Sequence, residues 1–190
     1  MSSHVWWLHV MLAALALTAC GAHPARTASD TDCAVAYQER ASGVASLTYG
    51  QFNGANKEGW RELERLRCYV EAARLLDDYR RTTTVSAGQA ATIDFHRGQV
   101  LAFADKPGDA LAAFQASLLP DGPIAPDGFD WNSYVRGTIA FFEGNAAELR
   151  RAEHRLSSSS HPNNRQNARF LRGLLSGLGE SYRAAYRPLD

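Results

Sequence analysis

From residue 32 onward, apolar side chains recur every three or four positions, which is the spacing of one face of an α-helix. The pattern predicts a first helix over about residues 32–47, with Asp30 or Asp32 as its N-cap. A second helix is expected over about residues 57–80. Its apolar stripe consists of Trp60, Leu63, Leu66, Val70, Ala73 and Leu76. Residues 49–54 between them (YGQFNG) have the composition of a turn, so the segment predicts a helical hairpin.

Beyond this hairpin, three blocks of the chain resemble one another. Each contains an aromatic residue, any residue, arginine and glycine, at positions 95–98, 134–137 and 170–173, and each then breaks before a second amphipathic segment. Two helices per period of about 30 to 45 residues are typical of α-solenoids, whose hairpins bury their apolar faces by stacking. The pattern predicts an all-α protein of stacked antiparallel hairpins, with an N-terminal hairpin over 32–86 and repeats over 87–190.

The best-preserved block, residues 92–120, resembles a tetratricopeptide repeat. Gly98, Ala110, Phe114 and Ser117 fall at the spacing of that family, with glycine in the first helix and the other three in the second. Gly98 and Ala110 are expected to let the two helices approach closely, because neither carries a bulky side chain. The two later blocks match the family less closely, and the resemblance implies a short tetratricopeptide-like array.

In tetratricopeptide arrays the first helices of successive repeats line a concave groove. The resemblance places there the partner-binding candidates Gln99, Phe103, Trp131, Tyr134, Thr138 and Phe142, with Phe170 and Leu174 approaching from the third block. Aromatic side chains supply large contact areas at low entropic cost, which suits them as anchors. For Phe95, Tyr134 and Phe170, which recur at one repeat position, packing between repeats is the alternative.

Three arginines also recur, at Arg97, Arg136 and Arg172. They are candidates for a ladder of forked donors that binds an acidic partner. The alternative is that they extend over the helix surface with their charges in solvent. The lysine and asparagine residues of the family's carboxylate clamp are not matched, so recognition of an acidic C-terminus is not implied.

The first twenty residues contain no Asp, Glu, Lys or Arg, and their apolar run at 10–19 is too short to span a bilayer. A run of this length fits the h-region of a secretory signal. It ends in the sequence LTAC at residues 17–20, which resembles the lipobox of bacterial lipoproteins. The resemblance implies a signal peptide over 1–19 and acylation of Cys20. The alternative is an ordinary signal peptide whose cleavage near Ala22 would remove Cys20.

The residues after the lipobox extend this interpretation. Residues 20–31 are polar and lack large apolar side chains, so they predict a flexible tether. Glycine after the lipobox cysteine implies, by the same resemblance, an outer-membrane address facing the periplasm. The membrane contact expected for this chain is therefore a lipid anchor.

Two further cysteines, Cys33 and Cys68, lie in the part expected to be exported. Export places them in an oxidising compartment, where spare cysteines tend to pair. Their midpoint falls at residues 50–51, inside the expected turn, and residues equidistant from the turn of an antiparallel hairpin lie at the same height. A disulfide is predicted, and two reduced buried cysteines are the alternative.

Composition narrows the function. The chain has 190 residues with 20 basic and 20 acidic side chains, and a net charge of zero argues against nucleic-acid binding. It contains no nucleophile elbow, zinc-protease motif, P-loop or dinucleotide-binding motif, and His154 and His161 lack a third ligand, so no metal or cofactor is expected.

These observations predict a non-catalytic, lipid-anchored repeat protein that binds a protein partner in the bacterial envelope, as a scaffold or an immunity-type factor. The alternative is a cell-envelope enzyme that acts on peptidoglycan through scattered catalytic residues.

Overall fold

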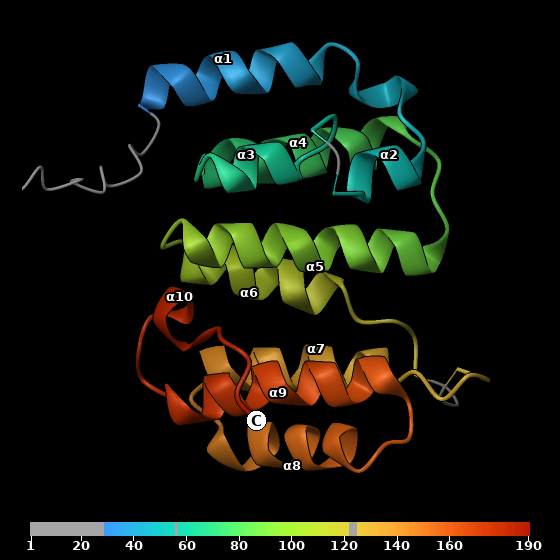
Figure 1. Cartoon of the computed structure of the whole chain (residues 1–190), viewed down its shortest axis with the longest axis vertical. Coiled ribbons are helices and arrows are strands. Elements are labelled where there is room, and N and C mark those ends of the chain that lie inside the picture. Colours follow the sequence, from blue (N-terminus) through green and yellow to red (C-terminus); the bar gives the residue numbers. More distant parts are fainter. Residues whose placement is uncertain (1–28, 56, 122–124) are drawn as a thin grey trace, which may run out of the picture.

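A computed structural model of the chain describes residues 29–55, 57–121 and 125–190, and in this part of the chain all regular structure is helical. The N-terminal region contains α1 (Asp30–Ala41), the 3₁₀ helix η1 (Val44–Ser46), α2 (Tyr49–Asn53), α3 (Arg61–Arg65) and α4 (Tyr69–Thr82). The rest contains α5 (Ala87–Phe103), α6 (Pro107–Ala116), α7 (Trp131–Phe142), α8 (Ala146–Ser157), α9 (Pro162–Ser176) and α10 (Tyr182–Ala185). The helices stack in successive layers from α1 to α8 (Figure 1). The predicted all-α fold of helical hairpins is confirmed.

The membrane-related predictions concern residues that the structure does not describe. The signal peptide over 1–19, the lipidation site Cys20 and most of the tether over 20–31 lie outside the described residues. Among the residues that are described, no helix is both long and apolar enough to cross a bilayer.

The first helix begins two residues earlier than expected and is capped by Ser29 rather than by Asp30 or Asp32. The Ser29 hydroxyl accepts the N–H of Asp32, whose carboxylate accepts the N–H of Ser29 in return. This reciprocal capping box satisfies two backbone donors that would otherwise lack partners. The helix ends at Ala41, before the 3₁₀ turn, and does not extend to residue 47.

The expected turn and second helix also differ from the prediction. Residues 49–53 form α2, because Thr48 and Gln51 make a second capping box that the turn-like composition concealed. The helix expected over 57–80 is broken at Arg67, whose positive φ of 63° ends α3 before α4 begins. Val70, just after the break, is exposed, whereas Ala73 and Leu76 of the predicted stripe are buried together with Leu75.

Cys33 and Cys68 form the predicted disulfide, with their Cα atoms 5.3 Å apart. The geometric reason for the prediction was wrong, however. Each cysteine lies at the start of its helix. Further along α1, the Tyr37 ring lies against Arg74 of α4 and the Tyr37 hydroxyl donates to Asp78 of the same helix. Later residues of α1 thus contact later residues of α4, so the two helices run in the same direction. The short α2 and α3 carry the chain back between them.

Glycine allows close helix packing in all three predicted blocks. A Cβ atom at Gly98 of α5 would lie 2.8 Å from the Phe114 ring of α6. At Gly137 of α7 it would lie 2.5 Å from Leu171 of α9. At Gly173 of α9 it would overlap the main-chain carbonyl of Arg187. The recurring aromatic-x-Arg-Gly pattern therefore marks the places where a first helix touches the element stacked on it.

The third block departs from a regular repeat after α9. Instead of a long second helix, the chain forms the four-residue α10, which contacts both α9 and α5. Figure 1 shows α10 beside the end of α5, away from α8. Residues 186–190 then return along α9, where the Leu189 N–H donates to the Arg169 carbonyl at 3.0 Å. We call Tyr186–Asp190 the C-terminal strap.

Candidate functional site

A cleft of about 340 Å³ lies between the first helices of the three blocks, α5, α7 and α9. Its floor includes Phe95, Gln99 and Tyr134, and its rim includes Trp131 and Phe170. Aromatic rings and amides dominate its lining, and none of the lining side chains in the described part of the chain carries a charge at neutral pH. The cleft therefore offers apolar surface together with neutral hydrogen-bonding groups.

The floor of the cleft is organised by a chain of hydrogen bonds. The Gln99 amide donates to the hydroxyl of Tyr186 at 2.7 Å, and that hydroxyl lies 3.0 Å from the hydroxyl of Tyr134. On the other side, the Gln99 carbonyl oxygen lies 2.8 Å from Nδ1 of His96. Burial lowers the pKa of His96 to about 4, so the imidazole is neutral at pH 7. Because Nδ1 donates to Gln99, Nε2 is left as an acceptor.

Phe170 was expected at the cleft, but the amide side chains of α9 that line it were not predicted from the sequence. Asn163, Gln166 and Asn167 line it one and two turns before Phe170, and their side-chain amides make no hydrogen bond within the described structure. Stepping back from Phe170 by three, four and seven residues would have found them, because these positions share one helical face. Their polar character gave no signal beside the apolar and aromatic positions that predicted the groove.

The predicted candidates separate into two groups. Gln99, Trp131 and Tyr134 line the cleft, together with Phe170. Phe95 and Tyr134 are also core residues, with 2% and 5% of their surface exposed, as the packing alternative required.

Thr138, Phe103 and Phe142 do not belong to the cleft. Thr138 is fully buried and donates to the carbonyl of Tyr134 one turn earlier. Phe103 packs against Tyr69 and Tyr182, while Phe142 lies beside Tyr182 on a separate hollow. The reason is that α10 crosses to α5 and covers this end of the helices.

The three recurring arginines are engaged within the chain and do not line the cleft. Arg97 lies 3.6 Å from a carboxylate oxygen of Asp77, and Arg172 donates to Glu153 at 2.7 Å. Arg136 pairs with Asp121. Each guanidinium is partly exposed, so these pairs contribute little to stability. Their geometry corresponds to the surface alternative and not to a ladder facing the cleft.

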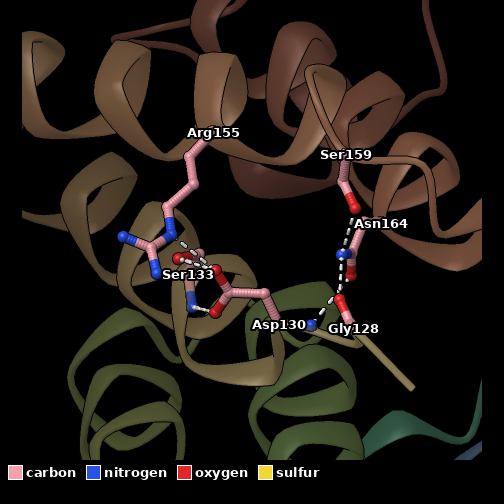
Figure 2. A network of polar contacts seen from close by, with 6 residues as sticks. All are labelled: Gly128, Asp130, Ser133, Arg155, Ser159 and Asn164. Atoms are coloured by element: carbon pink, nitrogen blue, oxygen red, sulfur yellow. Dashed lines mark hydrogen bonds and ion pairs between the residues drawn. The ribbon is translucent and has the colours of Figure 1, made fainter. Parts of the chain in front are cut away.

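A polar network holds two walls of the cleft in place (Figure 2). The Asn164 side chain is buried; it accepts the N–H of Asp130 and donates to Gly128 and Ser159. It thereby ties the loop before α7 to the loop before α9. Trp131 and Asn163 are the direct neighbours of these residues in sequence, so the network sets the spacing between the aromatic wall and the amide wall.

Asp130 is the charged centre of this network. It caps α7 by accepting the N–H and hydroxyl of Ser133, and it accepts a hydrogen bond from Arg155 at 2.6 Å. Burial alone would raise the pKa of Asp130, but the hydrogen bonds from Ser133 and Arg155 outweigh burial and hold that pKa below its usual value.

Asp130→Ala should lower the free energy of unfolding by about 1 to 2 kcal/mol at pH 7, because a helix cap is lost. Asp130→Asn is the matched control, since asparagine also caps helices. A carboxyl with a lowered folded-state pKa stabilises the fold above its unfolded pKa and loses that effect on acidification. The difference in free energy of unfolding between wild type and Asp130→Ala should therefore decrease below about pH 4. Urea denaturation at pH 7 and pH 3 measures the free energy of unfolding of both proteins. An equal difference between them at the two pH values would contradict a stabilising role for the ionised Asp130 carboxylate.

Among the described residues, no group of three or more His, Cys, Asp or Glu side chains could hold a metal ion. Comparison of the chain with protein-family models, curated proteins and solved structures gives no match. The cleft's geometry and the sequence are therefore the basis for the function proposed below.

Proposed function

We propose that this protein is a lipid-anchored, periplasm-facing helical-repeat protein that binds another envelope protein without catalysis, as an assembly scaffold or an immunity-type factor. The observation that carries the proposal is the uncharged aromatic and amide cleft between α5, α7 and α9. The tetratricopeptide-like sequence pattern supports it, because arrays of that family present the same helices to their partners.

The chemistry of the cleft defines what it would bind. An extended protein segment offers backbone N–H and carbonyl groups. The side-chain amides of Asn163, Gln166 and Asn167, which make no hydrogen bond to other described residues, can both donate to and accept from it. Trp131 adds only the apolar face of its ring, because its indole N–H already donates to the Ser117 carbonyl at 2.8 Å. The expected partner segment is uncharged where it enters the cleft, since an unpaired charge would lose its hydration there.

A photo-crosslinking amino acid at Gln166 tests this function in intact cells. One discrete protein adduct is expected at position 166 and none at Gln115, an exposed glutamine on α6 outside the cleft. Adding Asn167→Asp should reduce the adduct by about tenfold or more, because it introduces a charge without changing shape. Gln115→Glu is the control for added charge. An adduct that persists unchanged in Asn167→Asp, or no adduct at position 166, would contradict binding at this cleft.

The lipid anchor is tested separately by Cys20→Ser. Acylation requires the cysteine thiol, so the variant should move from the membrane fraction to the soluble periplasmic fraction. The measurement is the distribution of the protein between pellet and supernatant after cell lysis. If the variant stays in the membrane pellet as the wild type does, the prediction that Cys20 is lipidated is wrong.

A further inference from the structure

The C-terminal strap lies on α9 in the manner of a bound peptide. Residues 186–190 have no regular secondary structure, and their main chain makes two hydrogen bonds to α9. The Leu189 N–H donates to the Arg169 carbonyl, and the Leu189 carbonyl accepts from Arg172 at 3.2 Å. Gly173 leaves the space in which the Arg187 carbonyl rests. These are the contacts that a separate extended segment would make.

One side chain anchors the strap in the cleft. The ring of Tyr186 stacks on Phe170 with centroids 4.7 Å apart and an interplanar angle of 16°. Its hydroxyl fills the position between Gln99 and Tyr134, both of which are buried. If that hydroxyl leaves, the Gln99 amide and the Tyr134 hydroxyl lose a partner below the surface. The subsite is therefore selective for an aromatic ring that carries a hydroxyl group.

Outside Tyr186 and Leu189, the residues of the strap are exposed. They are Arg187, Pro188 and Asp190, of which Asp190 is held by a surface ion pair with Arg169. Exposed pairs of this kind contribute little. Tyr186 itself is only half-buried and lines the open cleft. A partner segment that enters the cleft would therefore reach the site that the Tyr186 ring occupies.

We propose that the Tyr186 position is a tyrosine-binding subsite, which the chain's own strap occupies until a tyrosine of the partner segment displaces it. This inference rests on the proposed function. It specifies that the partner segment binds through a tyrosine and that the strap regulates access to the cleft. An intramolecular ligand acts at high effective concentration, so the strap raises the affinity that a partner needs in order to bind. Segments without a tyrosine would leave Gln99 and Tyr134 without this partner and would displace the strap less effectively.

The test uses a fluorescent peptide with the sequence of residues 183–190 (RAAYRPLD). It should bind to a chain that ends at Ala185 and bind about tenfold or more weakly to the full chain, because the tethered strap competes. Replacing the peptide's tyrosine by phenylalanine should weaken binding to the shortened chain by about five- to tenfold. In the shortened chain, Gln99→Leu should remove much of that preference, since it deletes one of the two partners. Fluorescence anisotropy gives the affinities.

Two results would overturn the proposal. The first is a shortened chain that is folded but does not bind the peptide. The second is a shortened chain that is unfolded, because the strap would then be part of the core. Hydrogen exchange on the full chain is an independent measurement. The amide of Leu189 should exchange about a hundredfold or more faster than that of Leu174 in α9, because the strap opens without unfolding the protein. Equal exchange would overturn the proposal.

The peptide assay requires no envelope partner, so it separates the two proposals. A chain that binds the peptide in solution but forms no adduct from position 166 in cells retains its tyrosine subsite and lacks the proposed function.

Discussion

Gly98→Leu should lower the free energy of unfolding by about 3 kcal/mol, near the upper end of the cost of overpacking a core. The reason is local: even a Cβ atom at this position would lie 2.8 Å from the ring of Phe114. Phe114 is fully buried and packs at 5.0 Å from the ring of Phe95, so it has little room to move. The helices α5 and α6 would have to separate. In a chain of this length, the melting temperature should fall by about 6 to 12 °C.

Gly88→Leu is the matched control on the same helix. Nothing lies within 4 Å of a Cβ atom at Gly88, so the larger side chain meets open space and the variant loses a helix-disfavouring glycine. Its melting temperature should equal or slightly exceed that of the wild type. Thermal unfolding followed by circular dichroism compares the two variants. Equal melting temperatures for both variants would contradict close packing at Gly98 and the interpretation of the recurring motif.

The features that sequence predicted well are those decided within one helix pair. Gly98 and Ala110 belong to one helix pair, and small residues at the spacing of this motif indicate close packing whatever the rest of the chain does. In the structure the side chain that meets Gly98 is that of Phe114. The breaks between α5 and α6 and between α7 and α8 follow from Pro107 and Gly144, which favour helix starts and left-handed backbone respectively.

The features that sequence did not predict depend on distant contacts. Tyr186 meets Gln99 across 87 positions, and no local pattern announces that the strap returns to α5. The break between α3 and α4 was not predicted because the residue with left-handed backbone there is Arg67. Arginine is also common inside helices, so its presence does not indicate a positive φ. For the cleft, aromatic residues of α5 and α7 were found, whereas the amides of α9 were missed because polar side chains on a helix usually face solvent.

The Cys33–Cys68 pair shows how a correct contact can be predicted from an incorrect arrangement. Equal distances from a turn suggested that the cysteines face each other across an antiparallel hairpin. In the fold, α1 and α4 are parallel, and the cysteines meet because both stand at the starts of their helices. The disulfide therefore joins two helix beginnings across a connection that includes η1, α2 and α3. We therefore expect α1 to depend on the bond.

Reduction of the disulfide should lower the free energy of unfolding by about 4 kcal/mol, because the bond closes a loop of about 36 residues in the unfolded chain. Few other contacts between described residues hold α1 on the fold. It buries only Cys33, Ala36 and Tyr37, and Tyr37 joins it to α4 through a hydrogen bond to Asp78 and a ring contact with Arg74. Without the crosslink, α1 should open before the rest of the protein unfolds, since its apolar contact with α4 is small. Urea denaturation with and without reductant measures the loss.

Hydrogen exchange locates the effect of reduction within the fold. Amides of α1 should exchange faster by about tenfold or more after reduction, whereas those of α7 and α9, which share no contact with the disulfide, should change little. Cys33→Ala together with Cys68→Ala should reproduce the reduced protein, and Cys20→Ala, the matched cysteine control, should leave stability unchanged. The interpretation would be wrong if α1 stayed as protected in the reduced protein as in the oxidised one, because α1 would then be held by its packing on α4 alone.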